Sequence, residues 1–217
     1  MEPFVLENAR VRLSVPTIED IDDIYHYCRT DKELSRWTTI PQPYSTADAE
    51  WYIANAAKGW ASGKMLTWAV RNPRGCQGGG FDQSGALQVA RGVTDDTEPP
   101  ILGTIDLRFD DAPPGLVSGS IGYAMYPPAR GRGLMTEAVR LVLDWGFSTE
   151  GGNMARATWR ALVGNWPSRR VAWKAGFRVE GTLRSELIDR GKLADAWLGT
   201  LMKGDPLAPN EPWIGQS

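Results

Sequence analysis

The hydrophobic and polar positions of the chain change period several times, which predicts strands alternating with helices. Residues 11–15 alternate apolar and polar side chains, as expected of a half-buried strand. Thr17 and Asp20, and later Ser45 and Asp48, have the spacing of a helix-start capping box, and apolar residues at helical spacing follow each pair. Two helices are therefore predicted to begin near these positions.

The rest of the chain predicts a longer helix, a short helix and several strands. Apolar residues recur at helical spacing from Leu134 to Trp145, and Pro167 and Gly176 are suited to begin and end a short helix. Further strands are predicted over residues 66–70, 101–109, 118–125, 155–163, 177–187 and 195–202. The pattern indicates an α/β fold with about seven strands and about four helices.

Two segments depart from this pattern. Residues 73–100 are rich in glycine and proline, and we expect an insertion there with at most a short strand near residues 86–93. The proline-rich residues 206–217 are predicted to form a loose C-terminal tail. The remaining pattern is that of a single domain over residues 1–205.

Composition narrows the class of protein. A chain of 217 residues with 42% hydrophobic residues and a net charge of −2 can form its own core, and this near-neutral balance argues against a nucleic-acid partner. No apolar run approaches the ~20 residues of a membrane span, and no signal peptide is evident, so we expect a cytoplasmic protein with no membrane partner. Cys28 and Cys76 lie far apart, which predicts neither a disulfide framework nor a metal site.

The segment with the clearest chemistry lies between a predicted strand and a predicted helix. It contains Arg130-Gly131-Arg132-Gly133, in which glycines free the backbone amides and the helix start favours an anion such as a phosphate or pyrophosphate. No lysine follows the glycines as in a nucleotide-triphosphate loop, and Thr136 stands where a dinucleotide fingerprint has its third glycine. A simple turn with two solvated arginines remains the alternative.

The same segment resembles a known family. From Arg130 to Met135 it is similar to the (Q/R)xxGx(G/A) pyrophosphate loop of the GNAT N-acetyltransferases, which bind acetyl-CoA. The resemblance is to the ribosomal-protein-acetylating (RimJ/RimL-like) branch and covers roughly residues 8–203 without the insertion. Its other motifs are Ile121-Gly122-Tyr123, Thr136-Glu137-Ala138, Asn165 to Val171, Lys174 to Phe177, and Glu180-Gly181.

The resemblance implies a fold and an activity. The fold would be the GNAT fold, with a mixed, mostly antiparallel sheet, and the enzyme would transfer an acetyl group from acetyl-CoA to a primary amine by direct attack, without a metal. The acceptor would be a protein N-terminus or a small molecule, and a homodimer is common among such relatives. Two alternatives stay open: use of succinyl-CoA or another acyl-CoA, and a non-catalytic CoA-binding module, the latter because Ser120 stands where many members have glutamate.

By the same resemblance, the chain has candidate donor-site and catalytic residues. Ser168 would protonate the leaving thiolate, and the Met125 N–H would serve the oxyanion. Asn165, Thr136 and Ser168 have the alternative of purely local helix-start hydrogen bonds. The residues expected to bind the donor are Met125, Tyr126, Arg130, Gly131, Arg132, Gly133, Leu134, Met135, Thr136, Asn165, Ser168 and Lys174.

The base and the acceptor cleft are harder to assign. Asp106 is the candidate base, and an ion pair with Arg108 on a solvated strand edge is its alternative. A site without a strong base favours α-amines, whose pKa lies near 7.7–8.0, over lysine side chains near 10.4. The aromatic residues expected in the acceptor cleft, with core packing as their alternative, are Trp37, Tyr44, Trp51 and Tyr52.

Overall fold

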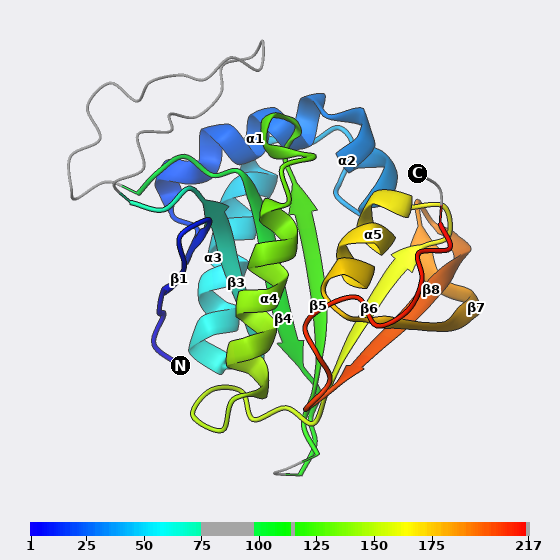
Figure 1. The fold of residues 1–217 in the computed structure, drawn as a ribbon. Coiled ribbons are helices and arrows are strands. Elements are labelled where there is room, and N and C mark those ends of the chain that lie inside the picture. Colours follow the sequence, from blue (N-terminus) through cyan, green and yellow to red (C-terminus); the bar gives the residue numbers. More distant parts are fainter. Residues whose placement is uncertain (75–97, 114–115, 216–217) are drawn as a thin grey trace.

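The computed structural model describes residues 1–74, 98–113 and 116–215, which form one sheet with helices on both faces (Figure 1). The strands are β1 (Leu6–Glu7), β2 (Arg12–Ser14), β3 (Met65–Arg71), β4 (Gly103–Phe109), β5 (Ser118–Met125), β6 (Arg156–Leu162), β7 (Arg178–Asp189) and β8 (Lys192–Met202). The helices are α1 (Ile21–Thr30), α2 (Lys32–Trp37), α3 (Thr46–Ser62), α4 (Leu134–Phe147) and α5 (Trp166–Lys174).

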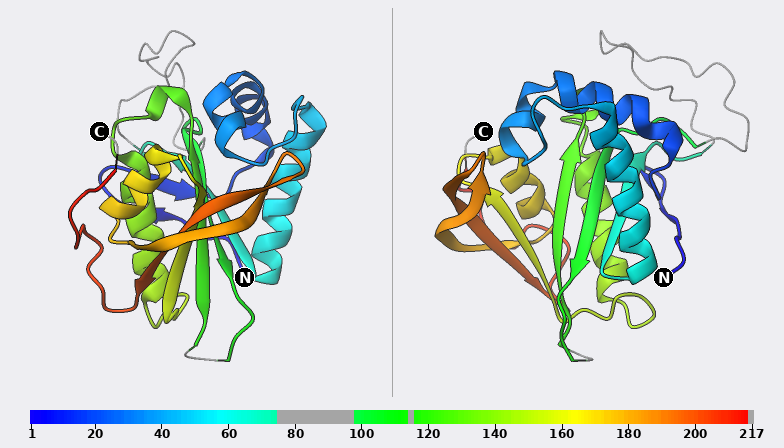
Figure 2. Two further views of the ribbon diagram at one scale, coloured as in Figure 1. Left: turned by 90° about the vertical axis from the view of Figure 1, so that its right-hand side faces the viewer. Right: turned by 180° about the vertical axis from the view of Figure 1, so that it is seen from behind.

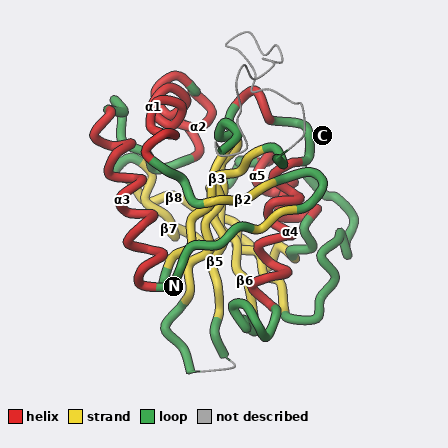
Figure 3. The backbone as a smooth tube through the Cα atoms, turned by 90° about the vertical axis from the view of Figure 1, so that its left-hand side faces the viewer, coloured by secondary structure: helices red, strands yellow, loops and turns green. Residues whose placement is uncertain are grey.

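The order of the strands creates an opening near the middle of the sheet. The order is β1-β2-β3-β4-β5-β6-β8-β7, and every neighbouring pair is antiparallel except β5 and β6. The parallel pairing of β5 with β6 ends at Ile121 and Trp159, although β5 continues to Met125. The two strands therefore separate over their last residues, while α1–α3 cover one face of the sheet and α4 and α5 the other (Figure 3).

Both capping-box predictions are confirmed. Ser45 and Asp48 exchange hydrogen bonds at the start of α3, where the Asp48 carboxylate accepts from the Ser45 N–H at 2.8 Å. Asp20 accepts from the Thr17 N–H at 2.8 Å, and a short 3-10 turn over Ile18–Asp20 leads into α1. These local hydrogen bonds satisfy amides that the first helical turn leaves without partners.

The predicted fold class is confirmed, and two short elements add to the expected count. Helix α2 has six residues and is capped by the Asp31 side chain, which accepts from the Glu33 N–H at 3.1 Å. Strand β1 has two residues and pairs with β2. Neither is long enough to show a hydrophobic period in the sequence. The strand considered near residues 86–93 lies outside the described residues.

The C-terminal segment is not loose over its described part, which corrects that expectation. Leu207 packs against the main core, and its carbonyl accepts from the Arg140 guanidinium at 2.9 Å. The ring of Trp213 lies 5.3 Å from that of Trp173 on α5. The proline content suggested an unstructured tail, but apolar and aromatic side chains between the prolines give the segment surface to bury.

The core holds much of the unusual aromatic content. Trp60, Trp68 and Trp159 are almost fully buried, and Phe4 and Trp145 pack around the first two with centroid distances from 4.9 to 6.2 Å. The buried Trp60 N–H donates to the Thr67 carbonyl at 2.8 Å, so burial leaves its polar atom satisfied. Among the described helices, none combines the length and apolar character needed to span a bilayer.

Candidate functional site

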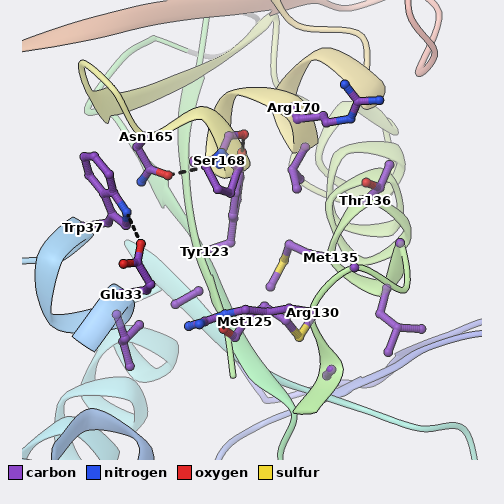
Figure 4. Close-up of a pocket in the computed structure, with 18 of the residues that line it drawn as sticks. Glu33, Trp37, Tyr123, Met125, Arg130, Met135, Thr136, Asn165, Ser168 and Arg170 are labelled. Carbon is purple, nitrogen blue, oxygen red and sulfur yellow. Dashed lines mark hydrogen bonds between the residues drawn. The ribbon is translucent and has the colours of Figure 1, made fainter. Parts of the chain in front are cut away.

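Two cavities meet at the opening between β5 and β6. The larger cavity, of about 500 Å³, is bounded by α2, the end of β5, the start of α4 and α5 (Figure 4). The smaller cavity, of about 370 Å³, extends from the same opening towards α1, β4 and the β7–β8 hairpin. The residues that line both cavities are Leu34, Trp37, Thr38, Tyr123, Ala124, Asn165 and Ser168.

The glycine segment before α4 forms a bend that borders the larger cavity. Gly131 and Gly133 have φ values of 74° and 77°, which side chains rarely adopt, and a Cβ at Gly131 would meet nothing within 4 Å. The first intrahelical donor of α4 is the Glu137 N–H, so the preceding amides, at Leu134, Met135 and Thr136, are free of helical bonds. Open space, free amides and the helix dipole suit a diphosphate.

The cationic side chains that line this cavity are only partly those predicted from the sequence. Arg130 lines the cavity, but its guanidinium pairs with Asp31 and donates to the Met125 carbonyl at 2.8 Å, so it braces the bend. Arg132 is exposed and does not line the cavity, so its expected contact with the donor stays a prediction. The lining cations on α5 are the expected Lys174 and also Arg170, which the sequence analysis did not select.

The open space at the bend predicts how a substitution there should change CoA affinity. Gly131→Ala places a methyl group in the open space of the bend and strains a left-handed backbone by about 1–2 kcal/mol. We expect CoA affinity to fall at least tenfold in isothermal titration calorimetry. Gly63→Ala is the matched control, because Gly63 has a φ of 68° and equally open surroundings at the end of α3. Equal CoA affinity in the two variants would show that the bend does not contribute to CoA binding.

The backbone at the end of β5 is only partly available to a ligand. Gly103 faces Met125 in the β4–β5 register, and the next N–H, of Tyr126, donates to the Leu102 carbonyl at 2.9 Å. Because successive residues of a strand point their N–H groups to opposite sides, the Met125 N–H points into the opening. The carbonyl of Tyr126 accepts from the Ala129 N–H at 3.1 Å. Tyr126 lines the smaller cavity, and its N–H and carbonyl both have backbone partners, so its expected pairing with the donor stays a prediction.

Ser168 is fixed at the junction by three neighbours. Its N–H donates to Asn165 Oδ1 at 3.2 Å, and its carbonyl accepts from the Tyr123 hydroxyl at 2.8 Å (Figure 4). Its Oγ accepts from the Trp159 ring N–H at 3.1 Å, which leaves the hydroxyl proton available for donation into the cavities. Asn165 does cap α5, as its local alternative predicted. The Ser168 Oγ instead bonds the Trp159 ring, and not a backbone group of α5.

Asp106 supplies a carboxylate to the smaller cavity. Arg108 lies 2.7 Å from its Oδ1, as the ion-pair alternative predicted, but the Asp106 side chain is only 18% exposed. Burial raises the pKa of Asp106 to about 6, against the opposing effect of Arg108. A Cβ at Gly122, directly across the ladder, would lie 2.8 Å from Oδ2, so the glycine of the Ile-Gly-Tyr motif makes room for this carboxylate.

The other predicted residues divide between the cavities and the surface. Tyr44, Tyr52 and Trp37 line the smaller cavity. Trp51 is 65% exposed on α3 and lines neither cavity, because helical spacing turns it away from its neighbour Tyr52. The predicted donor residues that do line the larger cavity are Met125, Arg130, Gly131, Gly133, Leu134, Met135, Thr136, Asn165, Ser168 and Lys174.

Sequence reasoning missed Tyr123 and Trp159 as site residues. Tyr123 belongs to the recognised Ile-Gly-Tyr motif, and its place near the end of a strand that precedes the glycine bend could have indicated a position beside Ser168. Trp159 gives no such signal, because a tryptophan in a strand is expected in the core. Across the described residues, no cluster of three or more histidine, cysteine or acidic side chains could hold a metal ion.

Comparison with known proteins identifies the family of the chain. Residues 10–178 match the model of the acetyltransferase (GNAT) domain. The chain belongs to the GNAT acetyltransferase family. It is 32% identical over 120 residues to the probable N-acetyltransferase YjcK of Bacillus subtilis (strain 168), an alignment that covers 52% of this chain and 61% of YjcK.

Solved structures share the fold of this acetyltransferase. Mycobacterium smegmatis RimJ in complex with CoA-disulfide superposes with a TM-score of 0.72 at 19% identity, covering 93% of this chain and 90% of RimJ. The microcin C7 self-immunity acetyltransferase MccE, in complex with acetyl-CoA and AMP, superposes with a TM-score of 0.70 at 18% identity, covering 90% and 93%. At these identities the similarity establishes the fold alone.

Proposed function

We propose that this N-acetyltransferase transfers the acetyl group of acetyl-CoA directly to a primary amine in a ternary complex. The observation that carries the proposal is the junction of the two cavities at Ser168: one side has the glycine bend and the other has a buried carboxylate. The structure of MccE with acetyl-CoA supports the donor assignment, as does the family.

The larger cavity suits the donor. The amides at the start of α4, together with Arg170 and Lys174, would hold the diphosphate of acetyl-CoA. The open side of β5 would pair with the extended arm in the manner of an added strand. The Met125 N–H would then face the carbonyl oxygen on which negative charge develops.

The smaller cavity suits the amine. A neutral amine nitrogen forms the new bond to the acetyl carbon as the carbon–sulfur bond breaks. Asp106, whose pKa of about 6 leaves it mostly ionised near pH 7, would take the proton that the amine gives up. The Ser168 hydroxyl would protonate the departing sulfur and recover its proton from solvent, so no covalent enzyme intermediate is needed.

The proposal predicts amine-dependent release of free thiol from acetyl-CoA. A steady-state assay should include a peptide N-terminus, because the sequence resembles the RimJ/RimL-like branch, together with a lysine side chain and small amines. The same assay with succinyl-CoA decides the acyl preference. Tight CoA binding with no thiol release by any amine would contradict the proposed transfer and favour a binding module.

A further inference from the structure

We infer that the smaller cavity selects a small monoamine whose amino group is carried on an apolar group, and rejects acceptors with a second positive charge. This inference rests on the proposed function and adds the chemical class of the acceptor. Its basis is the combination of an apolar wall, a single carboxylate with two arginines nearby, and a roof formed by the β7–β8 hairpin.

The wall opposite the junction is apolar and uncharged. It is formed by Ile24 and Cys28 of α1, Tyr52 of α3, and the buried Tyr44 and Tyr126. Burial raises the pKa of the Cys28 thiol to about 11 and the pKa of the Tyr44 and Tyr52 hydroxyls well above their ordinary value, so all of them are neutral near pH 7. Such a wall favours an apolar group that loses its hydration on binding.

The charges of the cavity disfavour a dication. Asp106 is the only carboxylate among the described residues of its lining, and Arg108 already pairs with it. Arg160 also lines the cavity and pairs with Glu186 at 3.1 Å. A second ammonium group would therefore leave water without gaining an anion from the described lining, and it would be repelled by the two nearby guanidinium groups.

The hairpin limits the size of the acceptor. Strands β7 and β8 cross towards the helical layer of α1–α3 (Figure 2), and the Arg190 guanidinium donates to the Ser35 carbonyl on α2 at 2.5 Å. Leu187 and Ile188 of this hairpin line the cavity. The ring of Trp37 lies against Gly164, where a Cβ would be 3.4 Å from it, and closes a second side. A cavity of about 370 Å³ with this roof suits a small molecule better than a side chain on a folded surface.

The test compares four amines in the thiol-release assay with saturating acetyl-CoA: 2-phenylethylamine, 1,4-diaminobutane, ethylamine and a peptide with a phenylalanine N-terminus. We expect kcat/KM for 2-phenylethylamine to exceed that for 1,4-diaminobutane, and that for ethylamine, by at least tenfold. A higher value for 1,4-diaminobutane, or for a peptide bearing a phenylalanine N-terminus, would overturn the inference while leaving acetyl transfer intact. No thiol release with any amine, despite CoA binding, would instead overturn the proposed function.

A charge placed on the hairpin tests the cause of the selectivity. Leu187→Glu gives the cavity a second carboxylate at a partly exposed position, and Leu187→Gln matches its size without the charge. Leu187→Glu should lower the preference for 2-phenylethylamine over 1,4-diaminobutane at least fivefold relative to Leu187→Gln. Equal preferences in the two variants would show that charge in this cavity does not set the choice of acceptor.

Discussion

Asp106→Asn is expected to lower kcat by about 10²- to 10⁴-fold, the usual contribution of a positioned general base, with little change in acetyl-CoA affinity. The amide has nearly the shape of the carboxylate, so it should fit the space above Gly122 but cannot accept the proton of the amine. In the unsubstituted enzyme kcat/KM should rise with pH through about 6, where Asp106 becomes ionised. Steady-state assays from pH 5 to 9 should show this limb, and the variant should lack it.

The same substitution should stabilise the fold at neutral pH. A raised carboxyl pKa means that the buried charge destabilises the folded state: the neutral form contributes fully below the ordinary pKa near 4, and that contribution is lost as pH rises through about 6. Two pKa units correspond to about 2–3 kcal/mol. We expect Asp106→Asn to raise Tm at pH 8, and the gain to shrink as the pH is lowered from 6 towards 4.

A matched control separates catalysis from general charge removal. Asp111 pairs with Lys64 on the surface, where its side chain is 88% exposed, so Asp111→Asn should change neither kcat nor Tm appreciably. If Asp106→Asn kept full turnover and the rising pH limb, Asp106 would be no more than the partner of Arg108.

Ser168→Ala is the second change with a large expected effect. Removing the hydroxyl should lower kcat by about 10²-fold or more, as expected for loss of a general acid. The Asn165 cap and the Tyr123 hydrogen bond both use the Ser168 backbone, so the start of α5 should persist and the Kd for CoA should change less than threefold. Stopped-flow thiol release, together with calorimetry of CoA binding, measures the two quantities separately.

Two further variants define the role of the hydroxyl. Ser168→Thr keeps an oxygen that can accept from Trp159 and should recover part of the lost turnover. Ser148→Ala removes a serine hydroxyl that donates to the Trp145 carbonyl at the end of α4 and lines neither cavity, so it should have no effect on turnover. Unchanged turnover in Ser168→Ala would exclude the serine from the proton transfer.

The fold could be predicted wherever a local pattern repeats. The period of α4 and the capping box of α3 identify those helices, since each depends on residues close in sequence. The six residues of α2 are too few to show a period, and they are helical because Asp31 caps them. The docking of residues around Trp213 depends on a partner on α5, a contact about 40 residues away that no local pattern records.

The features of the candidate site likewise divide into those set by local sequence and those set by distant contacts. The glycine bend is local, so its place beside the larger cavity could be predicted from the order of its residues. The ion pair of Arg130 could not be predicted from the sequence, because its partner Asp31 lies 99 residues away. Residue type could not distinguish the exposed Trp51 from the half-buried Tyr52, since both are aromatic and adjacent. The pKa of Asp106 depends on its burial by the assembled cavity.

Asp31 has a wider consequence for how this protein can vary. One carboxylate accepts from the Glu33 amide at the start of α2 and also holds the Arg130 guanidinium, and its side chain is only 7% exposed. The helix that borders both cavities and the bend that is proposed to hold the diphosphate thus share a single anchor. Exchange of Asp31 would therefore remove the cap of α2 and the brace of the bend together, whereas exchange of Arg130 would leave the cap in place.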